Sequence, residues 1–232
     1  MKLASIEDAK RRAVLKALQP IKSGWIIGVG SGTTTAYALA EIARLSRARH
    51  FELSVVPTSH QIENLAILHG LRIRSLNEAH TVDYAIDGAD QVEVPSLNLI
   101  KGGGAALLRE KIVDSTAHKL AIVVDESKIV KHLGDKQPIP LEVFPFAYKS
   151  VQVKLTNLGA RARLRESVGK IGPVITDNGN FILDADFGRL ENPSRLDRQL
   201  KMLPGLVETG LFLKMADRVY VGRGDRTVEV LE

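Results

Sequence analysis

Two aspartates that flank a Gly-Ala pair have the spacing of a proton-handling site. Asp87 and Asp90 stand in the segment DYAIDGADQVEV, where an apolar run that predicts a strand comes to its end. Two carboxyl groups this close can hold their protons with different strength, so that one donates while the other accepts. The same spacing also fits a turn in which Asp87 binds its own backbone, and the residues alone leave both interpretations open.

The segment LIKGGGAALLREKIVDS, residues 99–115, places three glycines between a lysine and a glutamate. The glycines precede a predicted helix, so their backbone N–H groups can approach an anion or an oxyanion, and Lys101 can add a positive charge there. Glu110 lies two turns into that helix, where a carboxylate can act as a base. A surface salt bridge is the alternative for a helical glutamate.

A third segment, GVGSGTTT at residues 28–35, is suited to a phosphate. It joins a predicted strand to a predicted helix, and its glycines let an anion approach the positive end of the helix dipole. Ser31, Thr33 and Thr34 add hydroxyl donors. A dinucleotide fingerprint needs glycine in place of Thr33, and a P-loop needs Gly-Lys-Ser/Thr, so neither pattern is present. A helix simply capped by these hydroxyls is the alternative.

These segments need a framework that gathers the ends of several strands. Apolar runs predict strands within residues 25–30, 52–59, 82–90 and 119–125. Helical periodicity predicts helices within residues 5–18, 33–47, 59–70 and 105–118, with Ser5 as the first N-cap. Strands and helices alternate at βαβ spacing, which predicts an α/β fold with a mostly parallel sheet covered on both faces. Ligands bind at the carboxyl ends of strands in such sheets, so all three segments are candidates for one site.

The pattern changes near residue 136. Residues 135–146 carry three prolines and are interpreted as a linker. A helix and a strand are predicted within 149–166, a hairpin around Asp177–Asn180, and a helix capped by Asn192. This mixture predicts a small α+β domain, and the apolar segment that begins at 205 is expected to rejoin the main sheet.

Composition narrows the class of protein. The chain has 232 residues, a net charge of +5 and no cysteine, which excludes disulfides, thiolate metal sites and cysteine nucleophiles. The six histidines lack metal-binding spacing, and no G-x-S-x-G elbow is present. Dispersed basic residues favour a small anion over nucleic acid. Because neither a signal-peptide core nor a membrane-spanning run appears, we expect no membrane partner and a cytoplasmic protein.

Seven segments of the chain match one family in the same order: GVGSGTTT, IDGADQV, IKGGGAALLREKIV, VVDESK, PIPLEVFP, TDNGNFILD and LPGLVETGLF. The chain closely resembles type A ribose-5-phosphate isomerase, and the resemblance covers most of its length. It implies a Rossmann-like catalytic domain and a small α+β domain, and the change of sequence pattern gives their bounds as 1–136 with 206–232 and 137–205. It also implies assembly as homodimers or homotetramers.

The activity that the resemblance implies is an aldose–ketose isomerisation. Ribose 5-phosphate and ribulose 5-phosphate, which belong to the non-oxidative branch of the pentose phosphate pathway, are interconverted through an enediolate. The family uses neither a metal nor an organic cofactor, so a phosphosugar is the expected small-molecule ligand.

The resemblance further implies roles for single residues. Glu110 is the base that carries a proton between C1 and C2. Asp87 and Asp90 handle the hydroxyl protons and ring opening, while Lys101 and the glycine loop stabilise the enediolate oxygen. The substrate-binding residues implied are Ser31, Gly32, Thr33, Thr34, Asp87, Gly88, Ala89, Asp90, Lys101, Gly102, Gly103, Gly104 and Lys128.

The chain departs from the family pattern at two places, and two other functions remain as alternatives. Gln91 stands where an acidic residue usually follows DGAD, and its lost charge leaves the local pKa values open rather than the reaction. The order Ser31-Gly32-Thr33-Thr34 replaces the common Thr-Gly-Ser-Thr but keeps the hydroxyls. The alternatives are a dehydrogenase that binds its nucleotide at residues 28–35 and a non-catalytic phosphosugar sensor or CoA-transferase-like relative. The sensor offers no reason to keep the lysine and the three carboxylates together.

Overall fold

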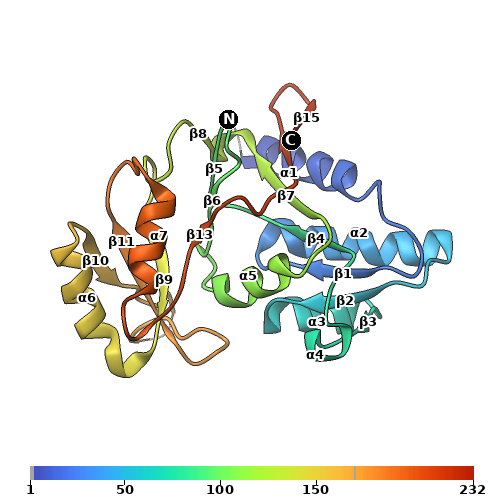
Figure 1. Ribbon diagram of the computed structural model, residues 1–232. Coiled ribbons are helices and arrows are strands. Elements are labelled where there is room, and N and C mark those ends of the chain that lie inside the picture. The colour runs from blue at the N-terminus through green and yellow to red at the C-terminus, as the bar shows by residue number, and fades with distance from the viewer. Residues whose placement is uncertain (1–2, 170) are drawn as a thin grey trace. The chain divides into compact units, whose positions relative to one another are not determined.

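The computed structural model describes residues 3–169 and 171–232, which form two compact units (Figure 1). The first unit contains the chain up to Ala89, together with Arg109–Ile129 and Met215–Glu232. The second contains Asp90–Leu108 and Val130–Lys214. This division differs from the predicted boundaries, because 90–108, 130–136 and 206–214 group with the second unit.

The first unit is built on a sheet of seven strands. Their order is β15-β14-β7-β4-β1-β2-β3. The bounds are β1 (Ile26–Val29), β2 (Ser54–Pro57), β3 (Arg72–Ile73), β4 (Tyr84–Asp87), β7 (Leu120–Asp125), β14 (Arg218–Gly222) and β15 (Val228–Leu231). All pairs are parallel except β14 with β15, so the predicted α/β class is confirmed.

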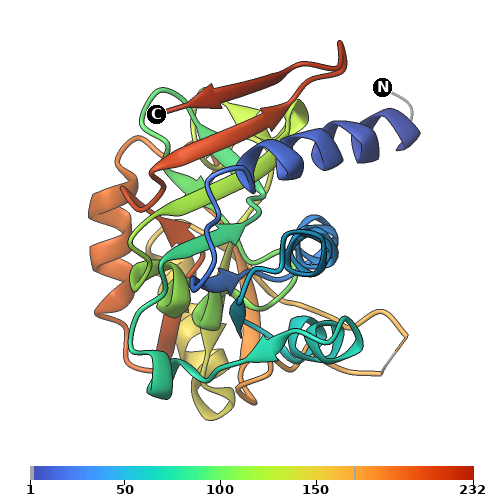
Figure 2. The same ribbon diagram turned by 90° about the vertical axis from the view of Figure 1, so that its right-hand side faces the viewer.

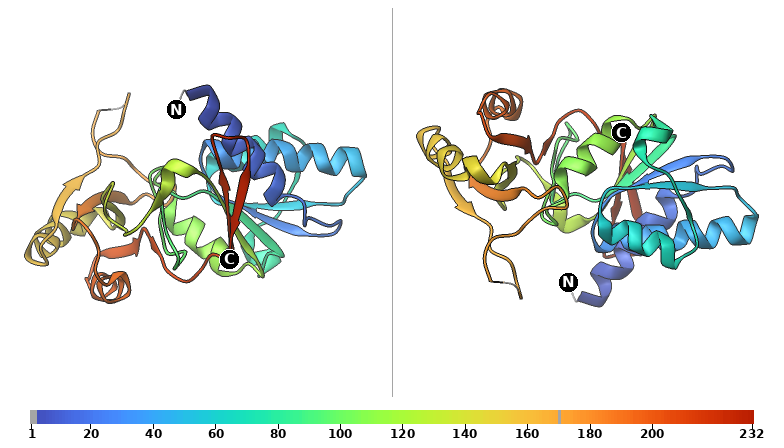
Figure 3. Two further views of the ribbon diagram at one scale, coloured as in Figure 1. Left: turned by 90° about the horizontal axis from the view of Figure 1, so that it is seen from above. Right: turned by 90° about the horizontal axis from the view of Figure 1, so that it is seen from below.

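Helices cover both faces of this sheet, as the end-on views show (Figures 2 and 3). The helices of this unit are α1 (Leu3–Ala17), α2 (Thr33–Arg49), α3 (His60–Leu68), α4 (Leu76–Ala79), α5 (Leu107–Ser115) and the 3-10 helix η1 (Glu126–Lys128). Helix α5 continues from the second unit into the first. Since α1 begins at Leu3, Ser5 lies inside the helix and the predicted N-cap is wrong.

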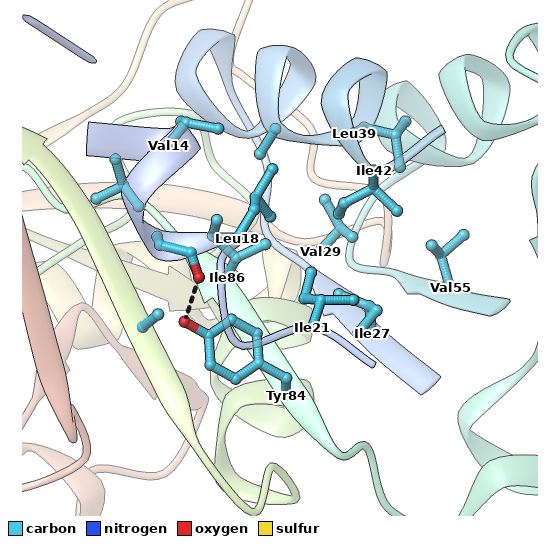
Figure 4. Close-up of a cluster of buried hydrophobic side chains, with 14 of the residues drawn as sticks. Val14, Leu18, Ile21, Ile27, Val29, Leu39, Ile42, Val55, Tyr84 and Ile86 are labelled. Atoms are coloured by element: carbon cyan, nitrogen blue, oxygen red, sulfur yellow. Dashed lines mark hydrogen bonds between the residues drawn. The ribbon is translucent and has the colours of Figure 1, made fainter. Parts of the chain in front are cut away.

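Strand β1 shows why its two faces differ. Ile27 and Val29 point into the cluster formed with α1 and α2, where Val14, Leu39 and Ile42 are also buried (Figure 4). Gly28 faces the other way, and a Cβ there would lie only 2.6 Å from Cγ1 of Val113 on α5. The glycine therefore lets α5 pack directly on the strand.

The second unit holds two smaller sheets. One has the order β10-β11-β9-β12 and is antiparallel throughout, with β9 (Ile139–Val143), β10 (Arg161–Leu164), β11 (Phe181–Asp186) and β12 (Leu206–Thr209). The other has the order β13-β6-β5-β8, with β5 (Gln91–Glu93), β6 (Leu99–Ile100), β8 (Ile129–Val130) and β13 (Leu211–Phe212). The helices are η2 (Pro145–Ala147), α6 (Tyr148–Asn157) and α7 (Pro193–Lys201), and Asn192 caps α7 as predicted.

The predicted linker at 135–146 is wrong, because β9 lies between two other strands of its sheet. Pro140 is tolerated there for a local reason. Its carbonyl accepts a hydrogen bond from Gly210 N at 2.7 Å, and in an antiparallel strand the N and O of one residue face the same neighbour. The missing N–H therefore faces Gly210, whose carbonyl accepts a hydrogen bond from Lys101 N at 2.9 Å instead.

Two further expectations need correction. Of the predicted segment 205–224, only β14 joins the main sheet, while β12 and β13 pair within the second unit. The predicted hairpin has one full strand, β11. Its other arm is reduced to an isolated bridge between Ile175 and Phe181, closed by a hydrogen bond from Thr176 N to Asn180 O at 2.9 Å.

Candidate active site

Asp87 ends β4 with a fully buried side chain. Strands β1 and β4 are parallel neighbours, so the loop after β1 passes directly beside it, and Gly30 N donates to Ile86 O at 3.0 Å. A Cβ on Gly30 would stand 1.9 Å from Cγ of Asp87. Asp87 Oδ1 also accepts from Gly88 N at 2.7 Å, so the carboxyl group closes its own turn while it fills the space that glycine leaves.

Glu110 is buried on α5, with 4% of the residue exposed. Its Oε1 accepts a hydrogen bond from Ser31 N at 3.2 Å. Glu110 is therefore not a surface residue, in contrast to the alternative that the sequence left open. A carboxylate held by an N–H in a dry position has the surroundings of a functional base rather than of a solvated charge.

The hydroxyl of Ser31 is held by two other residues that sequence reasoning missed. It donates to Ser59 Oγ at 2.7 Å and lies 2.8 Å from Thr58 Oγ1. Thr58 in turn donates to Val29 O at 3.1 Å, and Ser59 caps α3 by accepting from Ile62 N. The carboxyl ends of β1 and β2 are thus tied together by hydroxyl groups, which fixes the loop that contacts Glu110.

Helix α2 begins behind Gly32, whose φ of +116° favours glycine and whose position provides no side-chain cap. Gly32 N donates to Gln61 Oε1 at 3.1 Å, and the hydroxyl of Thr35 bonds back to Gly32 O. Thr33 is exposed and Thr34 is half-buried at the first turn. This helix end combines backbone N–H groups with hydroxyl donors and is suited to an anion.

Asp90 and the glycine loop lie together in the second unit. Asp90 Oδ2 accepts from Gly103 N at 2.7 Å, and a Cβ on Gly103 would stand 2.7 Å from Asp90 Oδ1. Gly102 has a φ of +106°, and a Cβ there would meet Leu107 at 2.7 Å. Gly104 is exposed and open. Two of the three glycines thus have a steric reason, and one amide binds Asp90 instead of facing solvent.

Lys101 is buried, with 2% of the residue exposed, at the end of β6. Its ammonium group lies 5.1 Å from the ring centroid of Phe212, which follows on the paired strand β13. A cation over an aromatic face is stabilised by the negative charge density of the ring. Lys101 N also donates to Gly210 O at 2.9 Å. Phe212 was not predicted as part of the site.

The remaining predicted residues are placed as follows. Gly88 and Ala89 are half-buried and join Asp87 to Asp90. Lys128 is half-buried and ends η1, the short helix that Asp125 caps with a bond from Ser127 N at 3.0 Å. Within the described part of the chain, no group of three or more His, Asp or Glu is arranged to hold a metal ion.

Gln91 is a departure from the family pattern whose position the structure explains. The side chain is fully buried at the start of β5. Its Oε1 accepts from Gly134 N at 3.0 Å, and its Nε2 donates to Gln137 O at 3.3 Å. The amide serves a donor and an acceptor of one backbone segment at once, which a carboxylate cannot do.

Comparison with known proteins identifies the family. The model of ribose 5-phosphate isomerase A, also called phosphoriboisomerase A, matches residues 54–226. The chain is 48% identical over 218 residues to ribose-5-phosphate isomerase A of Methanothermobacter thermautotrophicus, covering 94% of this chain and 95% of that protein. The chain belongs to the ribose 5-phosphate isomerase A family. It has the fold class of that family and, like its members, is an isomerase.

Other members of the family match almost the whole of this chain. The ribose-5-phosphate isomerase of Sus scrofa is 42% identical over 234 residues, covering 99% of this chain and 76% of the pig protein. A solved structure of D-ribose-5-phosphate isomerase in complex with phospho-erythronic acid superimposes with a TM-score of 0.95 at 43% identity, covering 100% of both chains. The structure of ribose 5-phosphate isomerase A from Methanocaldococcus jannaschii gives 0.93 at 41%, covering 97% of this chain and 99% of that one.

No described helix of this family member is both long enough and apolar enough to cross a membrane.

Proposed function

We propose that this chain interconverts ribose 5-phosphate and ribulose 5-phosphate through an enediolate, with Glu110 as the base. The observation that carries the proposal is the buried carboxylate of Glu110, held by Ser31 N directly behind β1. Burial keeps water away from the carboxylate and the bond to Ser31 N fixes its orientation, and both suit a base that must take a proton from carbon.

In this proposal Glu110 carries one proton from C2 to C1. In the open-chain aldose it takes the proton from C2, and the C2 electrons form the C1–C2 double bond while O1 becomes negative. Glu110 then delivers the same proton to C1, so that C1 becomes a CH2OH group and C2 becomes a ketone. No hydride, oxidant or metal is required, because the electrons stay within the substrate.

The oxygen protons need separate carriers, because O2 must lose a proton and O1 must gain one. Asp87 and Asp90 are the carriers in this proposal. Lys101 stabilises the negative charge that develops on the enediolate oxygen, and its burial strengthens that interaction relative to water. Gly103 N is already bonded to Asp90, so its role is to hold that carboxylate rather than to bind the substrate directly.

The phosphate group of the substrate is assigned to the start of α2. Ser31 and Gly32 form the turn into this helix, and their own N–H groups are bonded to Glu110 and Gln61. Thr33 and Thr34 present hydroxyls at the first turn of the helix, where the helix dipole favours a dianion. Lys128, the last residue of the short helix after β7, is assigned as a further substrate contact on the family motif VVDESK.

A direct assay tests the proposed reaction. The purified chain is mixed with ribose 5-phosphate alone, and formation of ribulose 5-phosphate is followed by NMR. The proposal predicts conversion to an equilibrium mixture from either side. If neither pentose phosphate is converted, while millimolar NAD or NADP gives a binding heat, the dehydrogenase alternative holds instead.

The family resemblance also supports a finer statement about assembly and place. We infer homodimers or homotetramers in the cytoplasm, with the phosphosugar as small-molecule ligand and neither nucleic acid nor membrane as partner. Light scattering after size-exclusion chromatography measures the assembly. A monomer at micromolar concentration would contradict it.

A further inference from the structure

The peptide unit between Gly102 and Gly103 is held on both of its edges. Gly102 O accepts a hydrogen bond from Arg165 Nη1 at 2.8 Å. Gly103 N donates to Asp90 Oδ2 at 2.7 Å. Because the peptide unit is planar and trans, its C=O and N–H point in opposite directions. This single rigid peptide group therefore connects the guanidinium of Arg165 to the carboxylate of Asp90.

The orientation of this peptide group must be fixed by a further contact, because the group lies between two glycines. Neither Gly102 nor Gly103 has a Cβ to hinder rotation, so the plane can turn about the bonds on either side at little steric cost. A half turn would aim the carbonyl of Gly102 at the carboxylate of Asp90, oxygen against oxygen. The N–H that now stabilises the carboxylate would then be lost.

Arg165 has the geometry to make that contact. It stands directly after β10, where its N donates to Ile182 O at 2.9 Å. Its Nε donates to Asp184 Oδ2 at 2.8 Å, and Nη2 bonds to the other oxygen of the same carboxylate. This two-point contact fixes the plane of the guanidinium group. The remaining Nη1 then points at two carbonyls of the loop, Gly102 O and Gly103 O, the second at 3.0 Å.

We propose that Arg165 is a positioning residue for the isomerase reaction, which acts by fixing the Gly102–Gly103 peptide so that Gly103 N–H holds the Asp90 carboxylate. The inference rests on the proposed function, in which Asp90 carries a hydroxyl proton. The Arg165 and Asp184 side chains are only 18% and 24% exposed, so the interaction is less screened than a surface pair. The positive guanidinium also polarises the peptide, which makes Gly103 N–H a stronger donor.

A double-mutant cycle tests the coupling between Arg165 and Asp90. Arg165→Gln, Arg165→Lys, Asp90→Asn and the double variant Arg165→Gln/Asp90→Asn are assayed for kcat and KM with ribose 5-phosphate. We expect Arg165→Gln to lower kcat about 10- to 100-fold, the scale of a misplaced catalytic group, with KM changed less than about threefold. In the Asp90→Asn background the same substitution should cost less than about twofold.

The lysine variant separates shape from charge. Lysine keeps the positive charge but cannot bind a carboxylate and two carbonyls from one plane, so Arg165→Lys should fall in the same range as Arg165→Gln. A matched control is Arg161→Gln. Arg161 pairs with Asp186 across the same two strands, with 84% of its side chain exposed, and is expected to leave kcat unchanged.

Amide hydrogen exchange at Gly103 gives a second readout that does not depend on activity. Its N–H should exchange faster in Arg165→Lys than in the wild type or in Arg161→Gln.

Three outcomes would overturn the proposal or its basis. Additive losses from Arg165→Gln and Asp90→Asn would overturn it, because Arg165 would then act by another route. Wild-type kcat in Arg165→Lys, with unchanged exchange at Gly103, would show that the Gly102–Gly103 peptide does not need to be fixed by Arg165. Wild-type kcat in Asp90→Asn would instead contradict the proposed role of Asp90, and the two failures are told apart by that variant alone.

Discussion

Asp87 and Glu110 contact consecutive residues of one loop. The Asp87 carboxyl group occupies the space beside Gly30 where a Cβ would stand, and Glu110 accepts a hydrogen bond from the N–H of Ser31. The two carboxylates come from β4 and α5, which are separated in sequence, yet the loop after β1 fixes both of them. Any change that moves this loop is therefore expected to affect both groups.

Gly30→Ala tests the first of these contacts. The new methyl group would lie 1.9 Å from Asp87 Cγ, so the buried carboxyl group must move. We expect kcat to fall about 10²-fold, as for other displacements of about 1 Å at a reacting centre. Activity is measured well below the melting temperature of the variant, with circular dichroism as the control for folding. An unchanged kcat in a folded Gly30→Ala would mean that the position of Asp87 is not critical.

Lys101 and Phe212 form a pair that can be dissected. Lys101→Ala should lower kcat more than it raises KM, because its charge is needed most as the enediolate forms. Phe212→Leu keeps the ammonium group but removes the aromatic face, worth about 0.5–2 kcal/mol, so a loss of about 2- to 30-fold in kcat is expected. If Lys101→Ala raises only KM, the lysine is a binding residue and the assignment is wrong.

Gln91→Glu separates stability from catalysis. The carboxylate can still accept from Gly134 N but cannot donate to Gln137 O, and it brings a buried charge. We expect a loss of about 1–3 kcal/mol in the free energy of unfolding, measured with urea, and a kcat within about threefold of the wild type. A large change in kcat at unchanged stability would place Gln91 in the reaction.

Removal of metal ions should leave the reaction intact. The proposed steps move protons between carboxylates and substrate oxygens and need no Lewis acid. Activity after dialysis against EDTA, compared with the same sample before dialysis, checks this. Restoration of a lost activity by zinc or manganese would contradict the metal-free mechanism.

The sequence predicted the main sheet well because its information is local. Apolar runs such as β1 and β7 end at turns, and the βαβ spacing leaves few arrangements. The strand β9 was missed for a local reason as well, since a proline usually marks the absence of a central strand. What spares Pro140 is the position of Gly210, about seventy residues further along the chain, which no local pattern reveals.

The candidate site divides along the same line. Asp87, Asp90, Lys101 and Glu110 stand out in the sequence because of their spacing and their family motifs. Arg165 does not, because an arginine in a strand pair with several charges has the pattern of an ordinary surface residue. Its contact with the glycine loop depends on how β10 packs, and Phe212 likewise reaches Lys101 only through the pairing of β6 with β13.

The most direct test of the mechanism is the Glu110→Gln variant in deuterated water. Glutamine keeps the size of the side chain and can still accept from Ser31 N, but it cannot take a proton from carbon. We predict a loss of about 10²- to 10⁴-fold in kcat and a parallel loss of deuterium exchange at C2 of ribose 5-phosphate. Binding of a phosphosugar analogue, measured by calorimetry, should change little. Near wild-type turnover and exchange in this variant would show that another group, with Asp87 first to be examined, is the base.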